Sequence, residues 1–259
     1  MTALSASIAG IGFWADGLPS WDAALAFARD GIRPADAPAR PSPRLLAPNE
    51  RRRAPETVAI ALEVAQAACV AAGRDPATLP SVFASTHGDL AITDYMCGTL
   101  AGSPADISPI RFHNSVHNAA AGYWTIGTGC QQPATAISAY RATFAQGLLE
   151  ALSQLATGND AVLLVAYDTA ARGPLGSQAR SAGLLGAALV LARDGARPRL
   201  HASLGPGEPA PVDGPLARHA QENAMAPMLP LFDALAAGAR TASLAAGSGR
   251  VLRVEFDHA

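Results

Sequence analysis

Apolar and polar residues alternate along the chain in two patterns that together predict an α/β fold. Short apolar runs bounded by turn residues predict buried strands, as at 160–166 (DAVLLVA). Longer stretches predict helices, as at 54–73, where Pro55 and Glu56 stand in the first turn and Gly73 ends the helix. The predicted strands are 4–13, 79–85, 134–138, 160–166, 186–192, 197–204 and 250–256, and the predicted helices are 21–28, 54–73, 90–100, a small-residue helix from about 115, 144–156 and 228–237. Such alternation is typical of a layered α/β fold with a mixed sheet.

The same alternation predicts a single domain over residues 1–259, without internal repeats. Residues 34–49 hold five prolines and should form a loop. Prolines and glycines also gather in residues 205–217, which we expect to be a linker. The segment 205–259 is then a C-terminal extension of the same domain, with a linker, a helix and a final strand.

Composition excludes several classes of protein. The net charge is −2, and only 15% of residues are charged, so nucleic-acid binding is not expected. Three widely spaced cysteines, Cys69, Cys97 and Cys130, form neither a disulfide framework nor a zinc motif and fit a reducing cytoplasm. No segment reaches the roughly 18–20 apolar residues of a membrane span. Residues 1–17 contain no Lys or Arg and predict a strand instead of a signal peptide.

Three segments carry a family resemblance. They are SPIRFHNSVHNAAAGYWTIGTG at 108–129, QPATAISAYRATFAQGLLEAL at 132–152 and LATGNDAVLLVAYD at 155–168. In this order and spacing they resemble the N-terminal half of β-ketoacyl synthases of the thiolase fold. The first segment is most similar to short chain-length-factor partners of ketosynthases in aryl polyene and related pigment pathways. The resemblance implies a thiolase-like half: a layered α/β domain with a five-stranded mixed sheet flanked by helices.

The resemblance places an arginine where active members carry their nucleophile. In those members a cysteine stands where a strand turns sharply into a helix, and the helix N-terminus lowers the pKa of the thiol. Alignment of Pro133, Ile137 and Ser138 puts Arg141 at that position. A guanidinium remains protonated and cannot be acylated. Cys130 lies eleven residues earlier and is expected to be a small buried hydrophobe.

The half of the synthase that supplies two catalytic histidines also has no counterpart in this sequence. His201, His219 and His258 stand in none of the family's histidine motifs. The resemblance therefore implies a protein without condensation activity of its own, and no cofactor or metal is expected.

Two segments are candidates for contact with a partner. The family's arm, here Pro109–Asn114, is expected to be extended. In the family it crosses the dimer interface and reaches the partner's acyl pocket, so Ile110, Arg111 and Phe112 would lie at the pocket floor. Bulky side chains there would stop a growing chain, because each further methylene would lose about 0.8 kcal/mol of burial and clash. The alternative is that Phe112 belongs to the core. The family's nucleophile strand pairs across the dimer twofold axis. The resemblance therefore implies an interface that includes Ala134, Thr135, Ala136, Ile137, Ser138 and Ala139.

Three hypotheses for function remain open. In the first, the chain is a regulatory subunit that forms a heterodimer with a full-length β-ketoacyl synthase in fatty acid or polyketide-type biosynthesis and shapes its acyl tunnel. Arg141 would then bind a partner carboxylate or fill the vacant position. In the second, the chain is a weak malonyl-carrier decarboxylase. In the third, it is a stand-alone acyl or carrier-protein binding module. An acyl carrier protein is a further candidate partner, and the isolated chain is a candidate for twofold pairing with itself.

Other chemistry is less well supported by the pattern. His113 and His117 stand four residues apart, as two metal ligands on one helix face would, but no acidic residue or cysteine joins them. A hydrogen-bonding role is expected for both, and for His87. Ser138 lacks the G-x-S-x-G frame of an esterase nucleophile.

Overall fold

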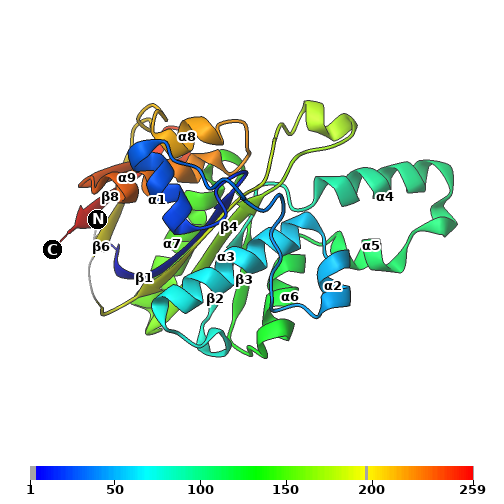
Figure 1. Cartoon of the computed structure of the whole chain (residues 1–259), viewed down its shortest axis with the longest axis horizontal. Coiled ribbons are helices and arrows are strands. Elements are labelled where there is room, and N and C mark those ends of the chain that lie inside the picture. The colour runs from blue at the N-terminus through cyan, green and yellow to red at the C-terminus, as the bar shows by residue number, and fades with distance from the viewer. Residues whose placement is uncertain (1–3, 196–197, 259) are drawn as a thin grey trace.

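One mixed sheet forms the centre of the chain in the computed structural model, which describes residues 4–195 and 198–258 (Figure 1). Its eight strands follow the order β3-β2-β4-β5-β1-β6-β8-β7. Strand β2 is parallel to β3 and β4, and the remaining pairs are antiparallel. The strands are β1 (Leu4–Ala15), β2 (Ser81–Ala84), β3 (Ala134–Ile137), β4 (Ala161–Asp168), β5 (Leu185–Ala192), β6 (Arg199–Pro206), β7 (Thr241–Gly247) and β8 (Arg250–Asp257).

Helices cover both faces of the sheet and enclose two apolar layers. On one face, α3 (Glu56–Ala72) and α6 (Ala119–Thr128) pack on residues such as Phe83 and Leu163. On the other, α1 (Trp21–Asp30), α7 (Thr143–Ala156), α8 (Pro215–His219) and α9 (Leu229–Ala237) cover residues such as Leu164 and Leu189. Within β4 and β5 every residue is buried, which explains why their sequences are apolar up to Asp168 at the end of β4.

Helix α3 lies unusually close to β1, and glycine makes this approach possible. A Cβ atom at Gly12 would lie 2.0 Å from the carbonyl oxygen of Val64, and one at Gly10 would lie 2.2 Å from that of Ala68. Since both neighbours are helix backbone, neither can move aside at low cost. The small residues of β1 therefore fix the position of the central helix.

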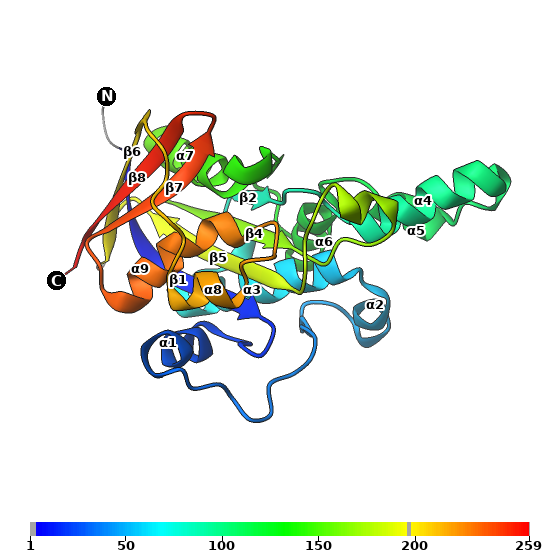
Figure 2. The same ribbon diagram turned by 90° about the horizontal axis from the view of Figure 1, so that it is seen from above.

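A helical hairpin projects from the body of the protein (Figures 1 and 2). It consists of α4 (Leu90–Gly102) and α5 (Pro109–Asn114). Ile92 is the one buried residue of α4, and Asn114 is the one buried residue of α5. The hairpin thus has little contact with the core and presents most of its surface outward.

Most predicted elements are present within a few residues of their expected bounds. The layered α/β class is confirmed, but the sheet has eight strands instead of five. The predicted extended arm is wrong, because residues Pro109–Asn114 form the helix α5. The small-residue helix begins at Ala119, not near 115. The predicted first residue of strand 197–204 lies outside the described residues. Besides α5, the α-helices and strands that were not predicted are α2 (Pro48–Arg53), α8 and β7.

Across residues 4–195 and 198–258, no helix is long and apolar enough to span a membrane.

Candidate functional site

The turn between β3 and α7 is held in a strained backbone conformation by hydrogen bonds. Ser138 donates its hydroxyl to the Thr86 carbonyl at 2.9 Å, and the Ala139 amide donates to Thr143 Oγ1 at 2.9 Å. Thr143 Oγ1 in turn donates to the Tyr140 carbonyl at 2.6 Å. Tyr140 has φ +50°, and among the described residues it is the one non-glycine with positive φ. Such a conformation costs about 1–3 kcal/mol, so the surrounding bonds hold a sharp strand-to-helix turn in place.

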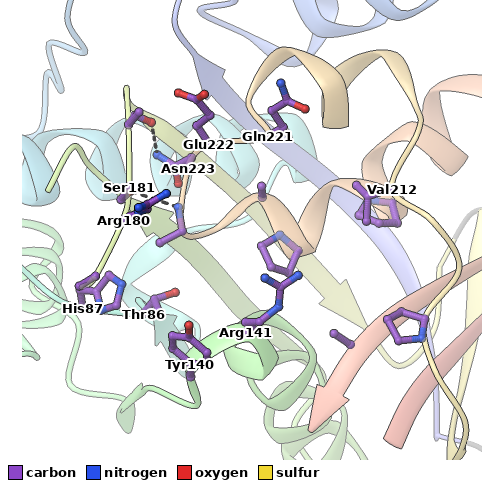
Figure 3. Close-up of a pocket in the computed structure, with 18 of the residues that line it drawn as sticks. Thr86, His87, Tyr140, Arg141, Arg180, Ser181, Val212, Gln221, Glu222 and Asn223 are labelled. Carbon is purple, nitrogen blue, oxygen red and sulfur yellow. Dashed lines mark hydrogen bonds between the residues drawn. The ribbon is translucent and has the colours of Figure 1, made fainter. Parts of the chain in front are cut away.

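A cavity of about 740 Å³ opens beside this turn (Figure 3). Its walls come from segments that are far apart in the sequence. The turn after β2 supplies Thr86 and His87, and the turn before α7 supplies Tyr140 and Arg141. The loop at 173–183 contributes Arg180 and Ser181. The segment between α8 and α9 contributes residues 221–224, 226 and 227. Its volume lies within the usual range for a small-molecule site.

Asp168 connects the end of β4 to the turn after β2 through hydrogen bonds. It is buried at the end of β4, where its carboxylate accepts the Ser85 hydroxyl at 2.7 Å and the Thr86 amide at 3.0 and 3.1 Å. Burial raises the pKa of this carboxyl above its ordinary value, and the hydrogen bonds oppose that rise. The buried Asn223 side chain donates to the carbonyls of Asp168 and Ala182, so it ties the cavity's loops to the sheet.

The histidines singled out in the sequence have separate roles. His117 Nε2 donates to the Ser85 carbonyl at 2.8 Å, and so helps to fix the segment that continues into Thr86 and His87 of the cavity lining. His113 lies edge-on to Tyr123, with ring centroids 6.4 Å apart. His87 lines the cavity. Within the described parts of the chain, no group of three or more His, Cys, Asp or Glu side chains has metal-binding geometry.

None of the three cysteines lies at the strand-to-helix turn. Cys130 is buried and donates its thiol to the Leu79 carbonyl at 3.5 Å, at the end of β3 opposite to Arg141. Cys69 is buried in α3, and burial raises the pKa of its thiol to about 12. Cys97 is exposed on α4. The expectation that Cys130 is a small buried residue is confirmed.

Strand β3 forms one edge of the sheet, and its second edge pairs with no strand of the described chain. The carbonyl of Pro133 accepts the amide of Ser81 in β2, and that of Ile137 accepts the amide of Ser85, directly after β2. Because backbone groups of successive residues point to opposite sides, those of Ala134, Ala136 and Ser138 point away from β2. All three are exposed. The six residues 134–139 therefore form an open edge bordered by α6, whose Ile126 is 82% exposed.

On the projecting hairpin, the side chains of Ile110 and Phe112 are 62% and 61% exposed. The alternative that Phe112 belongs to the core is therefore wrong. The guanidinium of Arg111 lies 4.1 Å from the ring centroid of Tyr95, and the hydroxyl of Tyr95 accepts the Ser108 amide at 3.0 Å. These contacts fix the orientation of α5 against α4. The structure keeps these residues apart from the cavity, whose lining includes Arg141.

Comparison with known proteins gives one family and a set of similar folds. The family model for the β-ketoacyl synthase N-terminal domain matches residues 25–253. No curated protein sequence matches the chain. Among solved structures, one similar chain is in the complex of the ketosynthase ApeO with its chain length factor ApeC from Xenorhabdus doucetiae. The identity is 20%, the TM-score is 0.76, and the alignment covers 97% of this chain and 99% of that one.

Two further structures extend the comparison. A chain of the ishigamide ketosynthase/chain length factor is 15% identical with a TM-score of 0.73, and the alignment covers 97% of this chain and 99% of that one. The ketosynthase from module 1 of the bacillaene synthase of Bacillus amyloliquefaciens is 12% identical with a TM-score of 0.58. There the alignment covers 79% of this chain but only 46% of that one. At these identities the similarity establishes the fold, which is thiolase-like as expected.

Proposed function

The chain belongs to the family of β-ketoacyl synthase N-terminal domains, and from this membership we propose that it is a non-catalytic, chain-length-factor-like subunit of a full-length β-ketoacyl synthase. The observation that carries the proposal is the turn between β3 and α7, which has no thiol. Its sequence is SAYRAT, from Ser138 to Thr143. Arg141 is the residue that alignment assigns to the nucleophile position. Tyr140, which precedes Arg141, has a positive φ. Its side chain has no thiol either, so neither residue of this turn can form a thioester.

No other cysteine substitutes for the missing nucleophile. Cys130 lies at the opposite end of β3, and Cys69 is buried in α3 with a raised pKa. A protonated, buried thiol is a poor nucleophile. Cys97 lies on the projecting hairpin, which contributes no residue to the cavity. These positions support a role without condensation chemistry.

The open edge of β3 is the proposed site of pairing. An unpaired strand edge with small, exposed residues is a template for another strand, and the residues concerned are Ala134, Thr135, Ala136, Ile137, Ser138 and Ala139. In the family the equivalent strands pair across the dimer twofold axis. The exposed Ile126 beside this edge would add apolar area to the contact. We propose a heterodimer with the synthase here, with twofold pairing of the isolated chain as the competing arrangement.

The projecting hairpin is the proposed means of influence on the partner. Ile110 and Phe112 are large apolar side chains that remain mostly exposed on a helix with few core contacts. Exposed apolar side chains grouped in this way are typical of a binding surface. On entering the synthase's acyl tunnel, they would form its floor together with Arg111, which is held against Tyr95, and would set the length of the tunnel. The products would be fatty acid or polyketide-type chains, such as those of aryl polyene pathways, delivered on an acyl carrier protein.

The chain is proposed to act as one domain. Strands β7 and β8 lie within the segment 205–259, and through β6 they continue the same sheet as the ketosynthase-like core. The core of the second face also includes Leu229, Phe232 and Val254 from this segment. The extension therefore folds with the rest of the chain.

Co-expression with a full-length synthase tests the pairing. The two proteins should co-elute on gel filtration as a 1:1 complex. The substitution Ala136→Lys should separate them, because it introduces a charge at the open edge. Thr241→Lys on β7, the opposite edge strand, is the matched control, since residue 241 is also exposed. Clean separation of the wild-type proteins, or equal loss of co-elution in both variants, would reject the proposed interface.

A further inference from the structure

The cavity beside the strand-to-helix turn holds two cationic side chains that have no counter-charge. Arg141 and Arg180 both line it. Among the described residues, neither guanidinium lies within 4.0 Å of a carboxylate, and the ion pairs that exist are elsewhere in the chain. Arginine presents several donors in a planar fork that fits a carboxylate or a phosphate. Two unpaired guanidinium groups in one cavity leave that donor capacity unused.

From this arrangement we propose that the cavity binds the carboxylate or phosphate group of a small molecule through Arg141 and Arg180. Arg141 extends from the turn into the cavity, and Arg180 lies on the wall formed by the 173–183 loop (Figure 3). The cavity is built entirely by this chain. The inference therefore stands independently of the pairing with a synthase, and either can fail alone.

Other charges near the cavity favour an anion. Helix α7 has 14 residues and begins at Thr143, directly after the turn, so the positive end of its dipole lies at the same wall. Glu222 is the acidic residue of the lining, and its carboxylate turns away from Arg141 at the far rim (Figure 3). The carboxylate of Asp168 is buried and accepts the donors of residues 85 and 86. The local balance is therefore positive.

Neutral donors and the size of the cavity complete the site. Ser181 Oγ accepts the Ala224 amide at 3.1 Å, which leaves its hydroxyl hydrogen available to a ligand. Asn223 fixes the 173–183 loop, which carries both Arg180 and Ser181, through bonds to the carbonyls of Ala182 and Gly183. A volume of about 740 Å³ exceeds what a simple inorganic anion needs. It leaves room for an organic group attached to the anion.

Titration calorimetry with defined probes tests this site. Malonate represents a carboxylate and inorganic phosphate represents a phosphate ester, while malonamide has the shape of malonate without its charge. We expect saturable 1:1 binding of malonate, phosphate or both, no binding of malonamide, and weaker binding at higher salt. The anion that binds more tightly shows whether the cavity prefers a carboxylate or a phosphate, and binding of either one supports the proposal.

Arginine variants locate the binding. Arg141→Gln and Arg180→Gln should each raise the Kd about tenfold, because each removes a charge-assisted hydrogen bond. Arg172→Gln is the control, since Arg172 is an exposed residue of the neighbouring segment that does not line the cavity. Circular dichroism melts verify that each variant is folded. Absence of saturable binding in the wild type, binding of malonamide as tightly as malonate, an unchanged Kd in both cavity variants, or an equal effect of Arg172→Gln would overturn the assignment.

Discussion

Truncation of Phe112 gives the sharpest quantitative prediction for the projecting hairpin. A phenylalanine buries about 150–250 Å² when it is fully covered, and Phe112 is 61% exposed in the isolated chain. About 120 Å² therefore remains to be covered by a partner, which corresponds to about 3 kcal/mol at roughly 25 cal/mol per Å². The methyl group that alanine retains reduces this to about 2–3 kcal/mol. We predict that Phe112→Ala raises the Kd for the synthase about 30- to 150-fold.

The same exposure predicts a small effect on the isolated chain. Urea unfolding should give a free energy within about 1 kcal/mol of the wild type, because little of the side chain is buried without a partner. Binding to the synthase is measured by surface plasmon resonance. Ile32→Ala is the control, since Ile32 is 60% exposed at a site remote from the hairpin, after α1. An unchanged Kd for Phe112→Ala, or an equal rise for Ile32→Ala, would refute the assignment of this hairpin to the interface.

Three further predictions concern the fold and the turn. Asp168→Ala should lower the free energy of unfolding at pH 7 by about 2 kcal/mol, because buried donors lose their acceptor. Burial raises the pKa of Asp168 in the folded chain, so its contribution is full below the unfolded pKa and is lost as the pH rises. The difference in unfolding free energy between the wild type and this variant, measured in urea, should therefore increase as the pH falls from 7 to 4. Gly12→Ala should lower the free energy of unfolding by about 3 kcal/mol, since its Cβ would lie 2.0 Å from the Val64 carbonyl oxygen. Gly98→Ala on α4 is the control: its Cβ would have nothing within 4 Å, so it should be neutral or slightly stabilising in the same assay. Arg141→Cys should not generate condensation activity in a radiolabelled malonyl assay, because under the proposed function the chain does not supply the family's catalytic histidines; measurable product would contradict the account.

Local signals predicted the core elements well and the edges of the fold less well. The apolar run of β4 and the Pro55-to-Gly73 frame of α3 left little ambiguity. Helix α5 carried its own signal, because Ser108 caps it and Pro109 stands at its first position. The family resemblance predicts an extended arm at this position, and the structure has a helix instead. Strand β7 was missed because its sequence, TASLAAG, is rich in small residues and holds no valine, isoleucine or aromatic residue.

The cavity illustrates a different limit of sequence reasoning. Alignment with the family identifies Arg141 as a candidate site residue, whereas Arg180 lies in a Gly/Ser-rich loop with no motif. The two meet only because the 173–183 loop and the turn before α7 open onto the same space. Their neighbours Thr86 and Asn223 are separated by more than half of the chain. No sequence window contains such a site, and three-dimensional packing is needed to find it.

The central claim is that this chain supports condensation by a partner and performs none itself. A reconstituted assay with malonyl-loaded carrier protein, run with this chain alone, with the full-length synthase alone and with both together, tests it most directly. The account predicts no carbon–carbon bond formation by the chain alone, and products from the mixture whose length distribution shifts when Phe112→Ala replaces the wild type. Condensation products from the chain alone, or a mixture indistinguishable from the synthase by itself, would contradict it.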